Sequence, residues 1–191
     1  MGDAHEDRAK AAELPKGDII RLLLEQHAEI KDLFATIPTT SGTDKAQLFA
    51  QLRTLLAVHE TAEEMILRPV VKGVVGESEA EARNHEELEA NKVLLELEKL
   101  NVDSPDFDQR LKAFQEAVDH HAEMEETEEF PGIVKDVDED QRQMMGKRFM
   151  MTEKIAPTHP HPNAAESMSK EILATPFLSV VDRVRDVLGA K

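Results

Sequence analysis

Four long segments of the chain repeat apolar residues at steps of three and four, and this pattern constrains the fold most strongly. The segments cover about residues 18–37, 44–68, 78–100 and 105–130, with clusters of Gly, Pro, Ser and Asp between them. No run alternates apolar and polar residues as a half-buried strand does. Short connections between long amphipathic helices are typical of antiparallel neighbours. The sequence therefore predicts an all-α chain, an up-down-up-down antiparallel four-helix bundle with additional C-terminal helices.

The ends of these helices are predicted from local chemistry. Asp18 and Ser104 are expected to be N-caps, and Ser78 begins a capping-box pattern. Pro69 and Pro131 are expected to end the second and fourth helices, since the residue before a proline is biased away from helical geometry.

Three regions are predicted along the chain. Residues 1–17 form a charged and frayed N-terminal tail, residues 18–131 form the bundle, and residues 132–191 form a C-terminal helical extension. The extension comprises a helix at about 138–155, a rigid Pro/His linker at 157–163 and an amphipathic stretch at 177–188.

Composition excludes several kinds of chemistry. The chain has 191 residues without Cys, Tyr or Trp, so disulfides, thiolate metal sites and phenolate ligands are ruled out. Its 39 acidic and 23 basic residues give a formal charge of −16, which disfavours nucleic-acid and anionic-membrane partners. No apolar run is long enough to span a membrane and no apolar signal core is visible, so a cytoplasmic protein is expected.

Each of the four predicted helices carries a histidine on its apolar stripe, and two helices add a glutamate one turn later. Burying unpaired carboxylates costs several kcal/mol each, and a bound cation would offset this cost. The inward polar residues are His27, His59, Glu63, His85, His121 and Glu125.

The predicted helix ends place these side chains at one height. His27 lies nine residues after Asp18, and His85 lies seven after Ser78. His59 lies nine residues before Arg68, and His121 lies nine before Phe130. In an antiparallel bundle these ends coincide, so at about 1.5 Å per residue the set falls within about one turn.

The set also repeats internally. The first helix pair gives one His and then His59-x-x-x-Glu63, and the second gives one His and then His121-x-x-x-Glu125. Such a repeat predicts two metal ions, each bound by two His, with Glu63 and Glu125 bridging between them. Imidazole and carboxylate ligands suit iron, manganese or zinc, and bridging carboxylates in a bundle core favour iron or manganese.

This spacing over about residues 18–130 resembles the hemerythrin-like, or HHE cation-binding, domain family. The resemblance implies a four-helix bundle around a non-haem di-iron centre that binds dioxygen. It implies that the iron ligands are His27, His59, His85 and His121 and that the bridges are Glu63 and Glu125.

The chain departs from oxygen-carrying hemerythrins at two positions. Glu89 stands where the third helix would carry a second His, and is a further candidate ligand. The carboxylate of the fourth helix would be Glu126 by the carriers' spacing rather than Glu125. A more anionic ligand set lowers the reduction potential of the iron. We therefore hypothesise that the site is less suited to simple reversible carriage of dioxygen.

Other polar residues are assigned to solvent or to supporting positions. Glu86 and Glu129 are predicted on solvated faces, and Glu60 is predicted to face solvent or to support a ligand. His120 is predicted to support a ligand or to lie between helices. His159 and His161, in the Pro/His linker, are expected to be structural or solvent-facing.

Three functions follow from this site. The first is a di-iron protein that binds dioxygen, nitric oxide or peroxide. The second is an enzyme that decomposes peroxide or reduces dioxygen with electrons from a donor that the sequence does not identify. The third is iron storage or donation, or iron or oxygen sensing. Manganese and zinc remain alternatives to iron.

Overall fold

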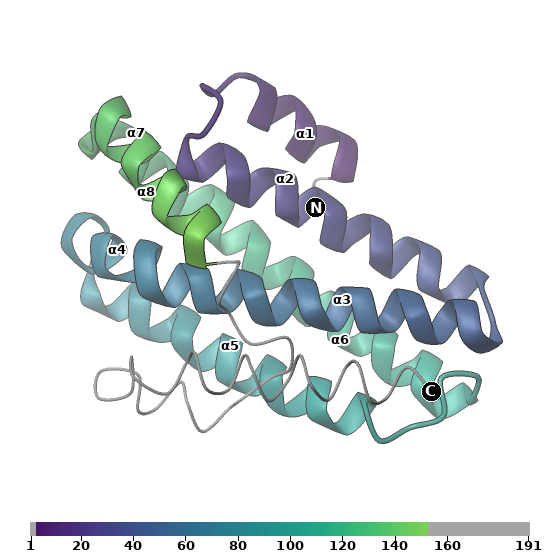
Figure 1. Ribbon diagram of the computed structural model, residues 1–191. Coiled ribbons are helices and arrows are strands. Elements are labelled where there is room, and N and C mark those ends of the chain that lie inside the picture. Colours follow the sequence, from purple (N-terminus) through teal and green to yellow (C-terminus); the bar gives the residue numbers. More distant parts are fainter. Residues whose placement is uncertain (1–2, 153–191) are drawn as a thin grey trace.

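A computed structural model describes residues 3–152, and every regular element in that range is helical. Four long helices run alongside one another (Figure 1). They are α2 (Ile19–Thr36), α3 (Gly42–Ala62), α5 (Glu77–Leu97) and α6 (Pro105–Met124). The prediction of an all-α chain is confirmed for the described residues. The linker at 157–163 with His159 and His161, and the stretch at 177–188, lie outside them.

The apolar core is divided into two clusters by a polar layer. On α2, α3 and α5, the core residues on one side of this layer belong to one cluster and those on the other side to the second, whereas the core residues of α6 belong to the second cluster alone. The first cluster includes Ile20, Leu23, Leu67, Ala80, Phe130 and Phe149. The second includes Phe34, Phe49, Leu52, Leu94, Phe107 and Phe114.

Two of the predicted N-caps are confirmed. Asp18 accepts a hydrogen bond from the backbone N–H of Ile20 at 3.0 Å, and Ser104 accepts one from Phe107 at 3.2 Å. The predicted capping box at Ser78 is wrong, because α5 already begins at Glu77. Its N-cap is Gly76, whose φ of +145° few other residues adopt.

Pro69 and Pro131 do not end their helices, which corrects the predicted boundaries. A π-helical turn, η2 (Glu63–Leu67), links α3 to α4 (Arg68–Val74), and a second, η3 (Glu125–Glu129), links α6 to α7 (Phe130–Asp136). Within η2, the N–H of Arg68 donates to the carbonyl of Glu63, five residues back. Each proline then stands in the first turn of a new α-helix, where its missing N–H removes no hydrogen bond.

The N-terminal segment is also ordered, which corrects the prediction of a frayed tail. Helix α1 (Ala4–Ala12) packs against α2 and buries Asp7 and Ala11. Asp7 accepts a hydrogen bond from Lys31 of α2 at 2.6 Å. The sequence predicts a solvated tail because six of residues 3–13 are charged, whereas the ordering of this segment depends on the buried ion pair.

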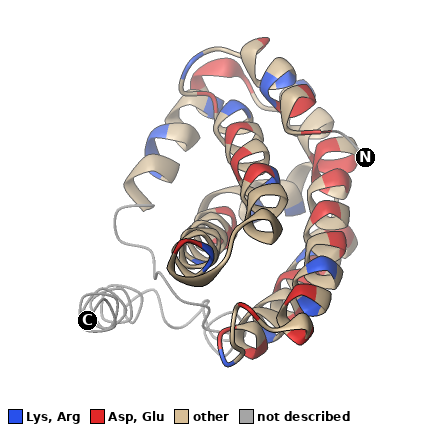
Figure 2. Cartoon of the chain, turned by 90° about the vertical axis from the view of Figure 1, so that its right-hand side faces the viewer, with Lys and Arg blue, Asp and Glu red and all other residues tan. Residues whose placement is uncertain are grey.

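Helix α8 (Glu139–Thr152) packs near the start of α2, and a short 3-10 turn, η1 (Ile37–Thr39), follows the end of α2. Arg142 of α8 donates to Asp18 at 2.8 Å and to the carbonyl of Val137 at 2.6 Å. Acidic residues recur along the helices (Figure 2), and in the whole sequence they outnumber basic ones by 39 to 23. None of the described helices combines the length and apolar character needed to cross a membrane.

We predict that Asp18→Ala destabilises the protein by about 3–5 kcal/mol, because it leaves the buried Arg142 without its carboxylate and removes a helix cap. Urea unfolding followed by circular dichroism measures this loss. The matched control is Asp3→Ala, which removes the N-cap of α1 at an exposed residue. Equal losses in the two variants would contradict the role of the buried pair.

Candidate metal centre

The polar layer consists of histidines and glutamates that converge from α2, α3, α5 and α6 and from the two π-helical turns. His27 and His59 are 2% and 4% exposed, and Glu63 and Glu125 are fully buried. Glu63 is the first residue of η2, and Glu125 is the first residue of η3. We call the set His27, His59, Glu63, Glu87, His121 and Glu125 the His–Glu cluster.

The His–Glu cluster divides into two groups whose potential ligand atoms lie within 4.8 Å of one another. One group is His27, His59, Glu63 and Glu125, and the other is Glu63, Glu87, His121 and Glu125. Glu63 and Glu125 therefore belong to both groups. Two adjacent sites that share two carboxylates have the donor arrangement of a dinuclear metal centre.

Several atoms at the middle of the cluster have no hydrogen-bond partner. These are Nε2 of His27, Nε2 of His121, both carboxylate oxygens of Glu63 and Oε2 of Glu125. The Nε2 atom of His59 lies 3.4 Å from Glu63 Oε1, and that of His27 lies 3.5 Å from Glu125 Oε2. Buried polar atoms are almost always paired, so this concentration of unpaired donor atoms fits a bound cation.

The other nitrogen of each imidazole is held by an oxygen acceptor. Nδ1 lies 3.1 Å from Glu126 in His27, 2.7 Å from Gln26 in His59 and 3.0 Å from Glu86 in His121. A proton on Nδ1 leaves the lone pair of Nε2 directed into the cluster, which is how metal-binding histidines are commonly oriented. The prediction that Glu86 is only solvated is therefore wrong, and Gln26 was missed because a single amide has no distinguishing spacing.

A buried arginine connects the carboxylates on one side of the cluster. Arg68 donates to both oxygens of Glu129 at 3.1 and 3.0 Å, to Glu125 at 3.3 Å and to Glu87. Glu129 is 1% exposed, which corrects its assignment to a solvated face. Arg68 therefore partly neutralises Glu87 and Glu125 of the cluster, as well as Glu129 beside it. Sequence spacing gave no indication of this role, because Arg68 stood at a predicted helix end.

His85 and Glu89 lie outside both groups, and their side chains are exposed. Glu89 accepts a hydrogen bond from Lys92 at 2.7 Å. The buried stripe of α5 instead runs through Ala80, Arg83, Glu87, Asn91, Leu94 and Leu97. Three of these six buried residues are polar. The apolar periodicity of the sequence therefore predicted that another face of α5, the one with His85 and Glu89, would be buried. As a result Glu87, which the sequence analysis did not single out, enters the cluster.

Neighbouring charges and burial give the three histidines of the cluster different pKa values. Burial opposes the protonation of His27, but Glu125 and Glu126 outweigh it and raise its pKa. The pKa of His121 is likewise raised well above its usual value, against burial, chiefly by Glu125. Burial and the neighbouring His27 lower the pKa of His59 to about 3. Burial also raises the pKa of the Glu63 carboxyl, and the charge of Glu125 adds to this effect.

Helix α1 is connected to the His–Glu cluster through Glu126, which lies between Lys10 of α1 and His27 of the cluster. Lys10 donates to Glu126 Oε2 at 2.9 Å, while the other oxygen of Glu126 faces His27. Although burial opposes it, the contacts with His27 and Lys10 lower the pKa of Glu126 to about 2. Glu126 is therefore an anion that orients His27, whereas Glu125 occupies the position shared by both groups.

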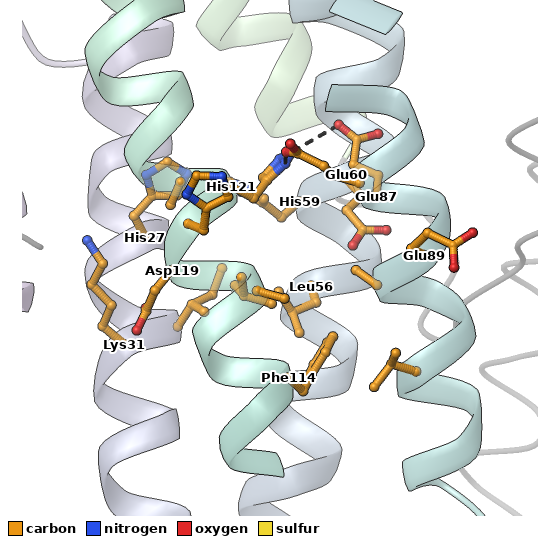
Figure 3. Close-up of a pocket in the computed structure, with 18 of the residues that line it drawn as sticks. His27, Lys31, Leu56, His59, Glu60, Glu87, Glu89, Phe114, Asp119 and His121 are labelled. Atoms are coloured by element: carbon orange, nitrogen blue, oxygen red, sulfur yellow. Dashed lines mark hydrogen bonds and ion pairs between the residues drawn. The ribbon is translucent and has the colours of Figure 1, made fainter. Parts of the chain in front are cut away.

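A cavity of about 320 Å³ adjoins the cluster. His27, His59 and His121 stand at one end, and Leu56 and Phe114 lie further along it (Figure 3). His85, Glu86 and Glu89 also line the cavity, so the exposed residues of α5 form part of its wall. A small molecule in this cavity could reach the histidines from one side.

Comparisons with known proteins give a matching family and similar proteins. The family model of the hemerythrin HHE cation-binding domain matches residues 18–133. An uncharacterised hemerythrin-like protein of Schizosaccharomyces pombe is 25% identical over 170 residues, which cover 87% of this chain and 84% of the relative. A DNA nickase of a Nostoc species is 26% identical over 133 residues, which cover 69% of this chain but 37% of that protein. No solved structure matches the chain.

We predict that loading the metal-free protein with a divalent cation at pH 6.5 releases protons, because the raised pKa values of His27 and His121 favour their protonated forms and both must lose that proton to bind. The carboxyl of Glu63, whose pKa is also raised, adds to the release. The release should fall as the pH rises through their raised pKa values. His59 is already neutral and contributes none. Calorimetry in buffers of different ionisation enthalpy measures the release, and its absence at pH 6.5 would contradict the prediction.

Proposed function

The chain belongs to the hemerythrin HHE cation-binding domain family, and on that premise we propose that its His–Glu cluster holds two iron ions and binds dioxygen or a related small ligand. The proposal includes an up-down-up-down antiparallel order for α2, α3, α5 and α6. The short connections between α2 and α3 and between α5 and α6 support that order.

One observation carries the proposal: unpaired donor atoms are concentrated where two groups share Glu63 and Glu125. Leaving a buried carboxylate without a partner costs several kcal/mol, and a cation bound in each of the two groups would offset that cost. Arg68 contacts Glu125 on one side but leaves both oxygens of Glu63 without a hydrogen bond. Protein side chains therefore satisfy the outside of the cluster and leave its centre to metal ions.

The donor set supports the choice of iron. Three imidazoles and three carboxylates are ligands of intermediate to hard character, which suit iron and manganese and leave zinc possible in chemical terms. We assign His27 and His59 to one ion, His121 and Glu87 to the other, and Glu63 and Glu125 to both. Iron in such a site supplies reversible electron transfer and an open coordination position for a small ligand.

The residues of this chain give that site its properties. Glu126, Gln26 and Glu86 hold the three imidazole rings in place through Nδ1. Apolar clusters on both sides of the layer exclude bulk water. The cavity next to His27, His59 and His121 gives a small ligand access to the cluster.

Peroxide decomposition is the second candidate, because Glu60, which also lines the cavity, is a partly buried carboxyl next to the cluster. Burial and the charge of Glu87 raise its pKa to about 8, so it can hold a proton near neutral pH. The DNA-directed activity named for the Nostoc relative is not proposed for this chain, whose charge of −16 disfavours binding to phosphates.

The proposed function is tested by metal analysis and visible spectroscopy on purified protein. We expect about two iron ions per chain and a visible spectrum of the ferrous protein that changes on exposure to dioxygen. Because the chain lacks Trp and Tyr, the near-ultraviolet region is also free of their absorption. Rapid oxygen evolution from added peroxide would favour the enzyme, and a chain that binds no iron would refute the proposal.

Substitutions test which residues bind the metal. We expect Glu63→Gln to lose iron, because this residue is shared by both groups. On α5 the structure and the sequence pattern favour different ligands, Glu87 and His85. We expect Glu87→Gln to lose about half of the iron and His85→Ala to retain it, since the exposed His85 lies outside both groups. The opposite result for the pair would show that α5 presents its His85 face to the cluster.

A further inference from the structure

The cavity beside the His–Glu cluster is larger than a diatomic ligand requires. Its volume is about 320 Å³, whereas one water molecule takes up about 30 Å³ in the liquid. A dry protein cavity of about 150 Å³ is large enough to bind benzene. The volume here is at the lower end of the range for sites that bind small organic molecules, about 300–1,000 Å³.

The walls of this cavity are mainly carbon. Ile30 of α2, Leu56 of α3, and Phe114 and Val118 of α6 line it, and Ala90 of α5 faces them. The imidazoles of His27, His59 and His121 stand at the end next to the His–Glu cluster, whereas Lys31, Asp119 and Glu89 lie at the sides (Figure 3). An apolar body with one end at the histidines would match this distribution (Figure 3).

The cavity opens between α5 and α6. Ala113, Ala117 and His120 of α6 line it and are exposed, as are His85 and Val93 of α5. Val93 is a large apolar side chain that remains 40% exposed. The two alanines carry no side chain beyond Cβ, so they leave the entrance wide.

Charge at the cavity disfavours an anionic occupant. Glu86 and Glu89 stand in its wall. Lys31 also lines it, but its ammonium group is already paired with Asp7 at 2.6 Å. An anion would therefore meet carboxylates and find no free lysine among the described lining residues.

We propose that this cavity binds an uncharged, mainly apolar organic molecule of one or two rings or a short alkyl chain, which enters between α5 and α6. The inference deepens the proposed function and rests on it in one respect, since the bound molecule would lie against the same metal centre. The cavity itself is built by the protein, so binding does not require the metal.

The test uses the full-length protein, with and without metal, titrated with 1-aminonaphthalene, whose fluorescence responds to an apolar environment. The protein contributes no Trp or Tyr emission. We expect saturable binding of one molecule per chain. The anionic probe 1-naphthalenesulfonate should bind far more weakly.

Two variants narrow the entrance, Ala117→Leu and Ala113→Leu, and each should weaken the binding of 1-aminonaphthalene by at least about tenfold. The matched control is Ala46→Leu, an exposed helical alanine of α3 that does not line the cavity. Circular dichroism checks the folding of each variant, and metal analysis checks the His–Glu cluster separately.

The outcomes separate the two proposals. Probe binding that is absent, that does not saturate, or that is equal in Ala117→Leu and Ala46→Leu would overturn the apolar-ligand proposal. A segment of this chain that fills the cavity would also abolish probe binding, and would overturn it likewise. Saturable probe binding by a protein that never binds iron would support the cavity ligand while refuting the proposed function.

Discussion

The burial of carboxylates at the centre of the helices is the constraint on which the rest of the structure depends. Glu63 and Glu125 are fully buried, and dehydrating such groups is costly unless charge or hydrogen bonds compensate. Arg68 compensates from one side, through Glu87, Glu125 and Glu129. The three histidines face the same centre, and metal ions would supply the remaining positive charge. The apolar clusters on both sides can pack only because this layer is neutralised.

The backbone is shaped around the same two glutamates. Each begins a π-helical turn, and each turn is followed by a residue and then a proline in a new helical segment. Single π-helical turns inside α-helices occur frequently at functional sites. Here the extra residue per turn changes the direction of the side chains after Glu63 and Glu125. It thereby brings Arg68 and Glu129 into the interior beside the His–Glu cluster. The internal repeat in the sequence is thus also a repeat of backbone geometry.

Much of this centre could be predicted from the sequence, because His27, His59, Glu63, His121 and Glu125 lie on strongly periodic stripes at positions that helix geometry brings together. The contribution of α5 could not, since its buried face carries Arg83, Glu87 and Asn91 and has little apolar periodicity. The helix ends predicted at Pro69 and Pro131 were wrong because a π-helical turn precedes each proline. The proline therefore stands in the first turn of a new α-helix, where it is tolerated, and not in the middle of an uninterrupted one. The order of α1 depends on Asp7 and Lys31, a long-range ion pair that no local pattern reveals.

The division of the apolar core has a consequence for folding cooperativity. Each cluster is continuous within itself, but the His–Glu cluster stands between them, so few apolar contacts link the two halves. With metal ions bound, the polar layer would be held together by its ligands and would join the two halves into one cooperative unit. Without the ions, the buried carboxyl of Glu63 has no hydrogen-bond partner at either oxygen, which would weaken the connection between the halves through the interior of the described chain. The metal-free protein should then unfold in two stages, with one half opening before the other, and the ions would determine whether this chain behaves as one folding unit or two.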